Sequence, residues 1–103
     1  MIRFAQVVTR LSSTIASRRG GDPTVSWTAK LLADPKLAAK KMGEEAIEAI
    51  LATSPDAFAA ESADLIYHWL VLAESRGVNL DAVADKLEER EGKSGIEEKA
   101  GRG

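Results

Sequence analysis

The chain has 103 residues, enough for one compact domain, and it contains no cysteine. Disulfide frameworks and zinc sites built from thiolates are therefore excluded. The first residues lack the apolar core of a signal peptide, and no apolar run approaches the roughly 18 residues that a membrane span needs. We expect a single domain over residues 1–103 that is soluble and cytoplasmic and has no membrane partner.

Charge is distributed unevenly along the chain, although the net value is only −2. Residues 1–43 carry eight basic side chains and two acids, whereas residues 44–103 carry fourteen acids and six basic side chains. A fold that brings these halves together would place carboxylates for a cation beside cations for a polyanion. Small domains without such a function also show uneven charge. Nucleic-acid binding is not expected, because the acidic half has no basic stripe.

Apolar spacing predicts helices at the N-terminal end. Residues 4–18 place their apolar side chains at helical spacing, and the glycines and proline of residues 20–23 end that helix. Residues 24–33 are expected to form either a loop or a short helix.

Two dipeptides with proline mark the starts of the central helices. Asp34-Pro35 combines an N-cap residue with proline at the first helical position, which predicts a helix over residues 35–53. Ser54-Pro55 repeats this signal and predicts a second helix that runs to residue 76, where Gly77 closes it.

Capping residues also predict the C-terminal helices. Asn79 favours a helix over residues 80–91, which Gly92 ends, and residues 94–97 are typical of a capping box that opens one last short helix. No segment has the pattern of a strand. The expected fold is an all-α bundle of four main helices plus a short C-terminal helix.

The acids of the 35–53 helix share one band of the helical wheel. Glu44, Glu45 and Glu48 fall on this side, with Lys41 among them. The opposite, apolar side is expected to consist of Met42, Gly43, Ala46, Ile47, Ala49 and Ile50.

The 55–76 helix carries a second polar stripe. Glu61, Asp64 and His68 lie within about 60° of one another on the wheel. Two helices joined by a short turn pack antiparallel, so this stripe would face Glu45 and Glu48 across a groove. The flanking apolar residues Leu65, Trp69 and Leu72 should face a core.

Four converging carboxylates repel one another unless a cation lies between them. Ligand sets made only of oxygen suit Mg²⁺ or Mn²⁺, whereas zinc prefers His or Cys. Such hard cations bind and polarise polyphosphates. One Glu-x-x-Glu pair alone is a weak signal, because Glu88 and Glu91 form another by composition. A solvated acidic face is the alternative interpretation.

The spacing of these acids resembles the signature of the all-α nucleoside triphosphate pyrophosphohydrolases, the MazG-like superfamily. Glu45-x-x-Glu48 is followed, after twelve residues, by Glu61-x-x-Asp64. Further stretches are similar to the phosphoribosyl-ATP pyrophosphatase family in particular, and these are Ser26–Leu32, Lys40–Ala46, Ala63–His68 and Arg90–Gly95. The similarity covers nearly the whole chain in order.

Two positions depart from the family pattern. Trp27 stands where tyrosine is common, so a hydrogen bond from that hydroxyl would be absent. Asp34-Pro35 stands where a glycine turn is usual.

The resemblance implies hydrolysis of 1-(5-phosphoribosyl)-ATP to 1-(5-phosphoribosyl)-AMP and pyrophosphate, the second step of histidine biosynthesis. It implies a Mg²⁺ cofactor, or Mn²⁺ in its place, and metal ligation by Glu45, Glu48, Glu61 and Asp64. One of these carboxylates, or Glu44, would orient or deprotonate the attacking water. The catalytic candidates are therefore Glu44, Glu45 and Glu48.

The phosphate groups of such a substrate need positive partners. The candidates are Lys30, Lys40, Lys41 and Lys93, with Arg18 and Arg19 behind them. His68 is a candidate for contact with substrate or with a carboxylate, and a histidine at the edge of the core is the alternative. Trp27 would either stack on adenine or belong to the core. Trp69 is expected in the core.

Apolar groups are expected on both sides of the acidic stripe, because Tyr67 and Val71 fall near its edge. A lone chain would leave one flank in water. We therefore expect a homodimer in which the 35–53 and 55–76 helices pack against their copies, as the resemblance also implies. A monomer whose second flank is covered by the 4–18 helix is the alternative.

Two other functions compete with the one implied by the family. A MazG-like hydrolase for other nucleotides would share the acids but leaves the 26–32 and 90–95 segments without an explanation. A non-catalytic helical interaction module would need no metal.

Overall fold

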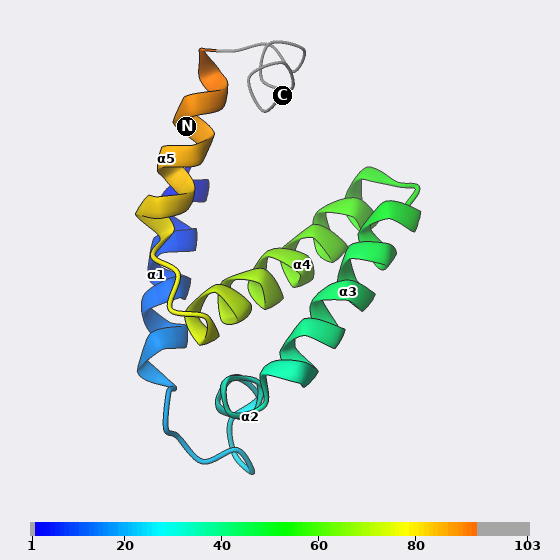
Figure 1. The fold of residues 1–103 in the computed structure, drawn as a ribbon. Coiled ribbons are helices and arrows are strands. Elements are labelled where there is room, and N and C mark those ends of the chain that lie inside the picture. The colour runs from blue at the N-terminus through cyan, green and yellow to red at the C-terminus, as the bar shows by residue number, and fades with distance from the viewer. Residues whose placement is uncertain (1, 93–103) are drawn as a thin grey trace, which may run out of the picture.

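The computed structural model describes residues 2–92, and these residues form five α-helices and no strand (Figure 1). The helices are α1 (Phe4–Ser17), α2 (Trp27–Ala33), α3 (Pro35–Leu51), α4 (Pro55–Ser75) and α5 (Leu80–Glu91). The prediction of an all-α bundle is confirmed, and a short helix is present within residues 24–33. The last predicted helix, which the capping box at residues 94–97 would open, lies outside the described residues.

The helices begin where the sequence provides caps. The side chains of Asp34, Ser54 and Asn79 each accept a hydrogen bond from a backbone N–H of the following turn, at 3.2, 3.1 and 2.7 Å. These bonds satisfy N–H groups that the first turn of a helix leaves without a partner. The predicted starts of α3, α4 and α5 are confirmed, while α3 and α4 end one or two residues earlier than expected.

Gly77 closes α4, as the sequence predicts. Its φ of 67° lies in the left-handed region that favours glycine. The N–H of Val78 then bonds to the carbonyl of Ala73 at 2.9 Å, which satisfies an acceptor in the last turn of the helix. The chain turns at this point towards α5.

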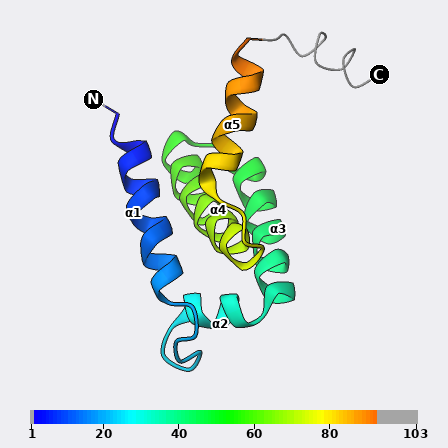
Figure 2. The same cartoon turned by 60° about the vertical axis from the view of Figure 1, so that its left-hand side comes forward.

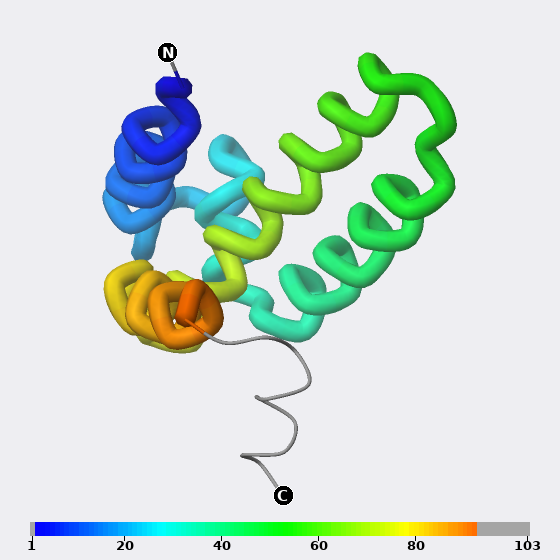
Figure 3. Tube along the Cα trace, turned by 90° about the horizontal axis from the view of Figure 1, so that it is seen from above, coloured from blue at the N-terminus to red at the C-terminus, as the bar shows by residue number. Residues whose placement is uncertain are grey.

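α3 and α4 form an antiparallel hairpin, and their contact is the most extensive between helices in the described chain. α1 and α2 also pack on α4 (Figure 2). Seen from above, α1 and α5 lie on one side of α4 and α3 lies on the other (Figure 3). The core forms where α1, α2 and α3 meet the C-terminal half of α4, and it consists of Ile15, Leu31, Leu32, Ala38, Leu70 and Val71. Trp69 packs against this core as expected.

The predicted apolar side of α3 is wrong in part. Ile47 and Ile50 are 59% and 78% exposed, whereas Glu45 is 8% exposed and faces inward with Ala49. The helical wheel gives the angle of each side chain but not which direction faces α4. Here the hairpin turns an acid inward and leaves two isoleucines on the solvent side.

The expectation that a single chain leaves apolar side chains beside the acidic stripe exposed to solvent is also wrong. Val71 is completely buried and Tyr67 is partly buried within this single chain. α1 and α2 pack against α4 and cover that flank. Any apolar surface available for a second copy therefore lies elsewhere.

Candidate metal centre

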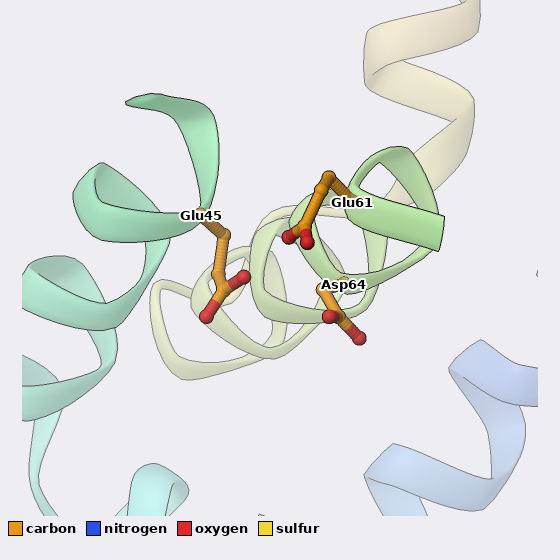
Figure 4. Close-up of side chains that lie close together, drawn as sticks. All are labelled: Glu45, Glu61 and Asp64. Carbon is orange, nitrogen blue, oxygen red and sulfur yellow. The ribbon is translucent and has the colours of Figure 1, made fainter. Parts of the chain in front are cut away.

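Three carboxylates from α3 and α4 converge inside the hairpin. One oxygen from each of Glu45, Glu61 and Asp64 lies within 4.8 Å of the other two. Figure 4 shows Glu45 extending from α3 towards Glu61 and Asp64 on the facing side of α4. Three of the four predicted metal ligands are thus brought together, at a separation that one shared cation can bridge after small side-chain rotations.

Two oxygens of this group have no partner in the described chain. Oε2 of Glu45 and Oε2 of Glu61 are both buried, and no hydrogen-bond donor within residues 2–92 reaches either atom. Buried acceptors are normally satisfied, and an unpaired one destabilises the fold. A hard divalent cation with its bound water would satisfy both oxygens, so the donor set fits Mg²⁺ or Mn²⁺.

Glu48 extends the group and perturbs it. The pKa of Glu61 is raised, first by a hydrogen bond with the Glu48 carboxyl group, then by burial and by the negative charges of Glu48, Asp64 and Glu45. Each of these effects favours the protonated form of Glu61. We call Glu45, Glu48, Glu61 and Asp64 the acidic cluster.

Glu44 is paired with a lysine instead of with the other acids. Lys41 donates a hydrogen bond to Glu44 Oε2 at 3.0 Å, and its Nζ lies 3.8 Å from Glu45 Oε1. The hydrogen bond is the main cause that lowers the pKa of Glu44 and raises the pKa of Lys41. Lys41 therefore joins Glu44 to the acidic cluster, and Glu44 is a poor proton acceptor in this arrangement.

His68 lies one turn beyond Asp64 on α4 and is 7% exposed. Its Nδ1 is 2.7 Å from the main-chain carbonyl of Asp64. A carbonyl can only accept, so Nδ1 carries a proton, and in the neutral imidazole Nε2 presents a lone pair. Nε2 is buried and has no partner among the described residues. The imidazole thus offers an open acceptor beside the acidic cluster.

The comparison with known proteins decides the family. Residues 8–91 match the model of the phosphoribosyl-ATP pyrophosphohydrolase family. The chain belongs to this family.

Individual relatives are similar in sequence to this chain over nearly its full length. A phosphoribosyl-ATP pyrophosphatase of Caulobacter vibrioides is 63% identical over 103 residues, which cover 97% of this chain and 96% of the relative. Another, of Caulobacter sp. strain K31, is 61% identical over 99% of this chain and 98% of its own length. The enzyme of that name from Paracoccus denitrificans is 54% identical over 90% of both chains.

The other lysines that the family resemblance suggests lie on α2 and α3. Lys30 is exposed, and its ammonium group lies over the ring of Trp27, 5.7 Å from the ring centre. Lys40 is exposed on α3, where its charge contributes to lowering the pKa of Glu44, after the stronger effects of Lys41.

Of the remaining basic candidates, Arg19 is paired at the other end of α4. Arg19 reaches Glu74 at the end of α4, with a charge pair at 3.4 Å and a hydrogen bond to the Glu74 carbonyl at 2.6 Å. This contact fastens the end of α1 to α4. Arg18 is exposed, and Lys93 lies outside the described residues.

One contact between α2 and α4 was not predicted from the sequence. The hydroxyl groups of Thr28 and Tyr67 share a hydrogen bond of 2.5 Å, which ties the first turn of α2 to α4. Tyr67 also packs edge-on against His68, with ring centres 4.9 Å apart. Both hydroxyl residues occur in stretches that resemble the family, which is the signal that could have paired them.

Proposed function

We propose that this chain hydrolyses 1-(5-phosphoribosyl)-ATP to 1-(5-phosphoribosyl)-AMP and pyrophosphate, the second step of histidine biosynthesis, with Mg²⁺ held by the acidic cluster. The observation that carries the proposal is the convergence of Glu45, Glu61 and Asp64, with buried oxygens that lack partners, in a member of this family. Mn²⁺ would serve in place of Mg²⁺, because it also prefers oxygen ligands.

The cation supplies charge neutralisation and polarisation of the phosphate oxygens when it is bound. The chain supplies its ligands, and Glu45, Glu61, Asp64 and Glu48 are the proposed set. In the reaction a water molecule adds to phosphorus at the α–β anhydride, the bridging P–O bond breaks, and pyrophosphate leaves.

Glu48 is the best placed of the candidate groups that would orient the water. It lies at the exposed edge of the acidic cluster, and its carboxyl group is the main cause that raises the pKa of Glu61. Glu44 would instead keep Lys41 in position through their 3.0 Å pair. Lys41 and Lys40 are proposed to bind phosphate oxygens, and His68 Nε2 to accept a hydrogen bond from substrate or water.

A second copy of the chain is the proposed partner of the solvent side of α3. Gly43, Ile47 and Ile50 are spaced four and three residues apart, so they share one face of the helix. A Cβ built on Gly43 meets nothing within 4 Å, although glycine in a helix interior costs about 1 kcal/mol relative to alanine. A neighbouring helix that approaches closely at Gly43 explains both the glycine and the exposed isoleucines. Leu51, four residues after Ile47 and 70% exposed, extends this apolar surface.

The proposed location is the cytoplasm, where nucleotide substrates are available. No helix within residues 2–92 has both the length and the apolar character required to cross a membrane.

Pyrophosphate release from phosphoribosyl-ATP, measured beside a panel of ordinary nucleoside triphosphates with Mg²⁺ present, tests this function. The expected kcat/KM for phosphoribosyl-ATP exceeds that for ATP by about 100-fold or more, since a site built to bind the added phosphoribosyl group discriminates strongly against a substrate that lacks it. Equal rates on ATP would favour a hydrolase of other specificity. No hydrolysis of any nucleotide would favour an interaction module.

A further inference from the structure

Trp27 and Lys30 form an exposed pair that the structural core does not require. Trp27 is 44% exposed, although a large aromatic ring gains most by burial. Lys30, three residues later, holds its ammonium group 5.7 Å from the centre of that ring. The inward side chains of α2 are Ala29, Leu31 and Leu32 instead. α2 is therefore anchored without Trp27, and its ring and the adjacent cation face solvent together.

A chain of contacts ties this pair to the acidic cluster. Thr28, next to Trp27, bonds to the hydroxyl of Tyr67 at 2.5 Å. Tyr67 lies three residues after Asp64 on α4, a rise of about 5 Å. The Thr28–Tyr67 bond thus connects the residue next to Trp27 with the helix that carries Glu61 and Asp64. A nucleotide whose phosphates lie at the acidic cluster has a base that can reach a neighbouring helix, and α2 is the helix that this bond ties to α4.

We propose that Trp27 and Lys30 form the subsite for the phosphoribosylated adenine of the substrate. The base stacks on the Trp27 indole, and Lys30 pairs with the 5-phosphate of the added phosphoribosyl group, which ATP lacks. This inference rests on the proposed function and adds the residues that distinguish phosphoribosyl-ATP from ATP. An aromatic face accepts any base, whereas a lysine beside it favours a base that carries an additional phosphate.

Steady-state kinetics of three variants test the subsite. Trp27→Ala should raise KM for phosphoribosyl-ATP roughly 5- to 150-fold, the range expected for the loss of base stacking, with a much smaller change in kcat. Trp27→Tyr keeps an aromatic face and should stay within about threefold of the wild-type KM. Lys30→Gln should raise KM for phosphoribosyl-ATP about tenfold without raising KM for ATP. Lys36→Gln, an exposed lysine on α3, is the matched control and should change neither value.

A binding measurement separates stacking from a purely structural effect. The chain has two tryptophans, so Trp69→Phe leaves Trp27 as the only one. Phosphoribosyl-AMP should quench the emission of this variant in a saturable way, and AMP should quench it at about tenfold higher concentration. The same titration of wild type and Trp27→Phe, both of which retain Trp69, repeats the test: phosphoribosyl-AMP should quench the emission of wild type more than that of Trp27→Phe. Inorganic phosphate alone should not quench either protein.

The outcomes distinguish this subsite from the proposed function. Hydrolysis of phosphoribosyl-ATP with unchanged KM in Trp27→Ala and Lys30→Gln, or binding of phosphoribosyl-AMP by calorimetry without quenching, overturns the subsite and leaves the function intact. Failure of the wild-type chain to hydrolyse phosphoribosyl-ATP overturns both. A raised KM in Trp27→Ala that Trp27→Tyr restores, together with quenching, supports the subsite.

Discussion

His68 donates a hydrogen bond of 2.7 Å from Nδ1 to the main-chain carbonyl of Asp64, one turn earlier on α4. The bond fixes which ring nitrogen carries the proton and holds the imidazole beside the acidic cluster. Nε2 is buried without a partner in residues 2–92, and it is an acceptor in the neutral imidazole. Because the carbonyl of Asp64 belongs to the backbone, this contact survives changes to the Asp64 side chain.

Two substitutions, His68→Gln and His68→Asn, distinguish the roles of the two ring nitrogens. Glutamine places an acceptor near the position of Nε2, whereas asparagine can reproduce only the donor at Nδ1. If Nε2 receives a hydrogen bond from substrate or water, His68→Gln should keep kcat/KM within about tenfold of wild type, and His68→Asn should lose about tenfold more. Thermal unfolding of both variants is the control for folding. Equal activity in the two variants would assign His68 to packing.

Glu61→Gln should stabilise the metal-free protein at neutral pH. The folded-state pKa of Glu61 is raised by its hydrogen bond with Glu48, by burial and by neighbouring carboxylates. For such a group, the stabilising contribution is fully present below the unfolded-state pKa and is lost as the pH rises through the folded-state value. The variant should therefore melt at a higher temperature than wild type near pH 7.5 in EDTA, and the difference should vanish near pH 4.

Asp56→Asn is the matched control for that experiment, because Asp56 is an exposed acid in the first turn of the same helix. Added Mg²⁺ should raise the melting temperature of wild type more than that of Glu61→Gln, since a bound ligand stabilises only the fold that holds it. A lower melting temperature for Glu61→Gln at pH 7.5 would contradict the repulsion within the acidic cluster.

The exposed apolar face of α3, which carries Gly43, Ile47 and Ile50, predicts how the proposed homodimer responds to mutation. Ile50→Asp and Gly43→Leu should both weaken the homodimer, the first by placing a charge in the interface and the second by blocking the close approach of helices. Neither should unfold the single chain, because Ile50 is 78% exposed and nothing lies within 4 Å of a Cβ on Gly43.

Sedimentation equilibrium at low micromolar concentration measures this effect. Wild type should show about twice the chain mass of 11.0 kDa, and both variants should shift towards a single chain. Leu87→Asp, on the exposed part of α5, is the control and should leave the mass unchanged. An active wild-type protein with the mass of one chain would refute the dimer.

The local signals in the sequence were sufficient for most of the helix boundaries. Asp34, Ser54 and Asn79 have short polar side chains that bond to the next turn, so each marks a start without any tertiary information. α2 could not be distinguished from a loop, because seven residues are too few to show a helical period.

The orientation of α3 depended on packing that the sequence does not reveal. A wheel drawn from apolar residues places Ile50 inside, whereas the structure turns Glu45 towards α4 and Ile50 towards solvent. A buried carboxylate is unfavourable unless a cation balances its charge. An exposed isoleucine on an apolar face is favourable when a partner surface covers it. Both departures coincide with the proposed metal site and the proposed dimer.

The most direct test of the account is the Mg²⁺-dependent kcat/KM for phosphoribosyl-ATP in Asp64→Asn, measured beside Glu48→Gln and the control Asp56→Asn. We predict that Asp64→Asn and Glu48→Gln each lose about 100-fold or more, because the loss of a metal ligand removes several kcal/mol of transition-state stabilisation. Their circular dichroism should match that of Asp56→Asn, which should remain active, and without Mg²⁺ they should melt at least as high as wild type because repulsion within the acidic cluster is relieved. Activity within about tenfold of wild type for both Asp64→Asn and Glu48→Gln would contradict the metal site.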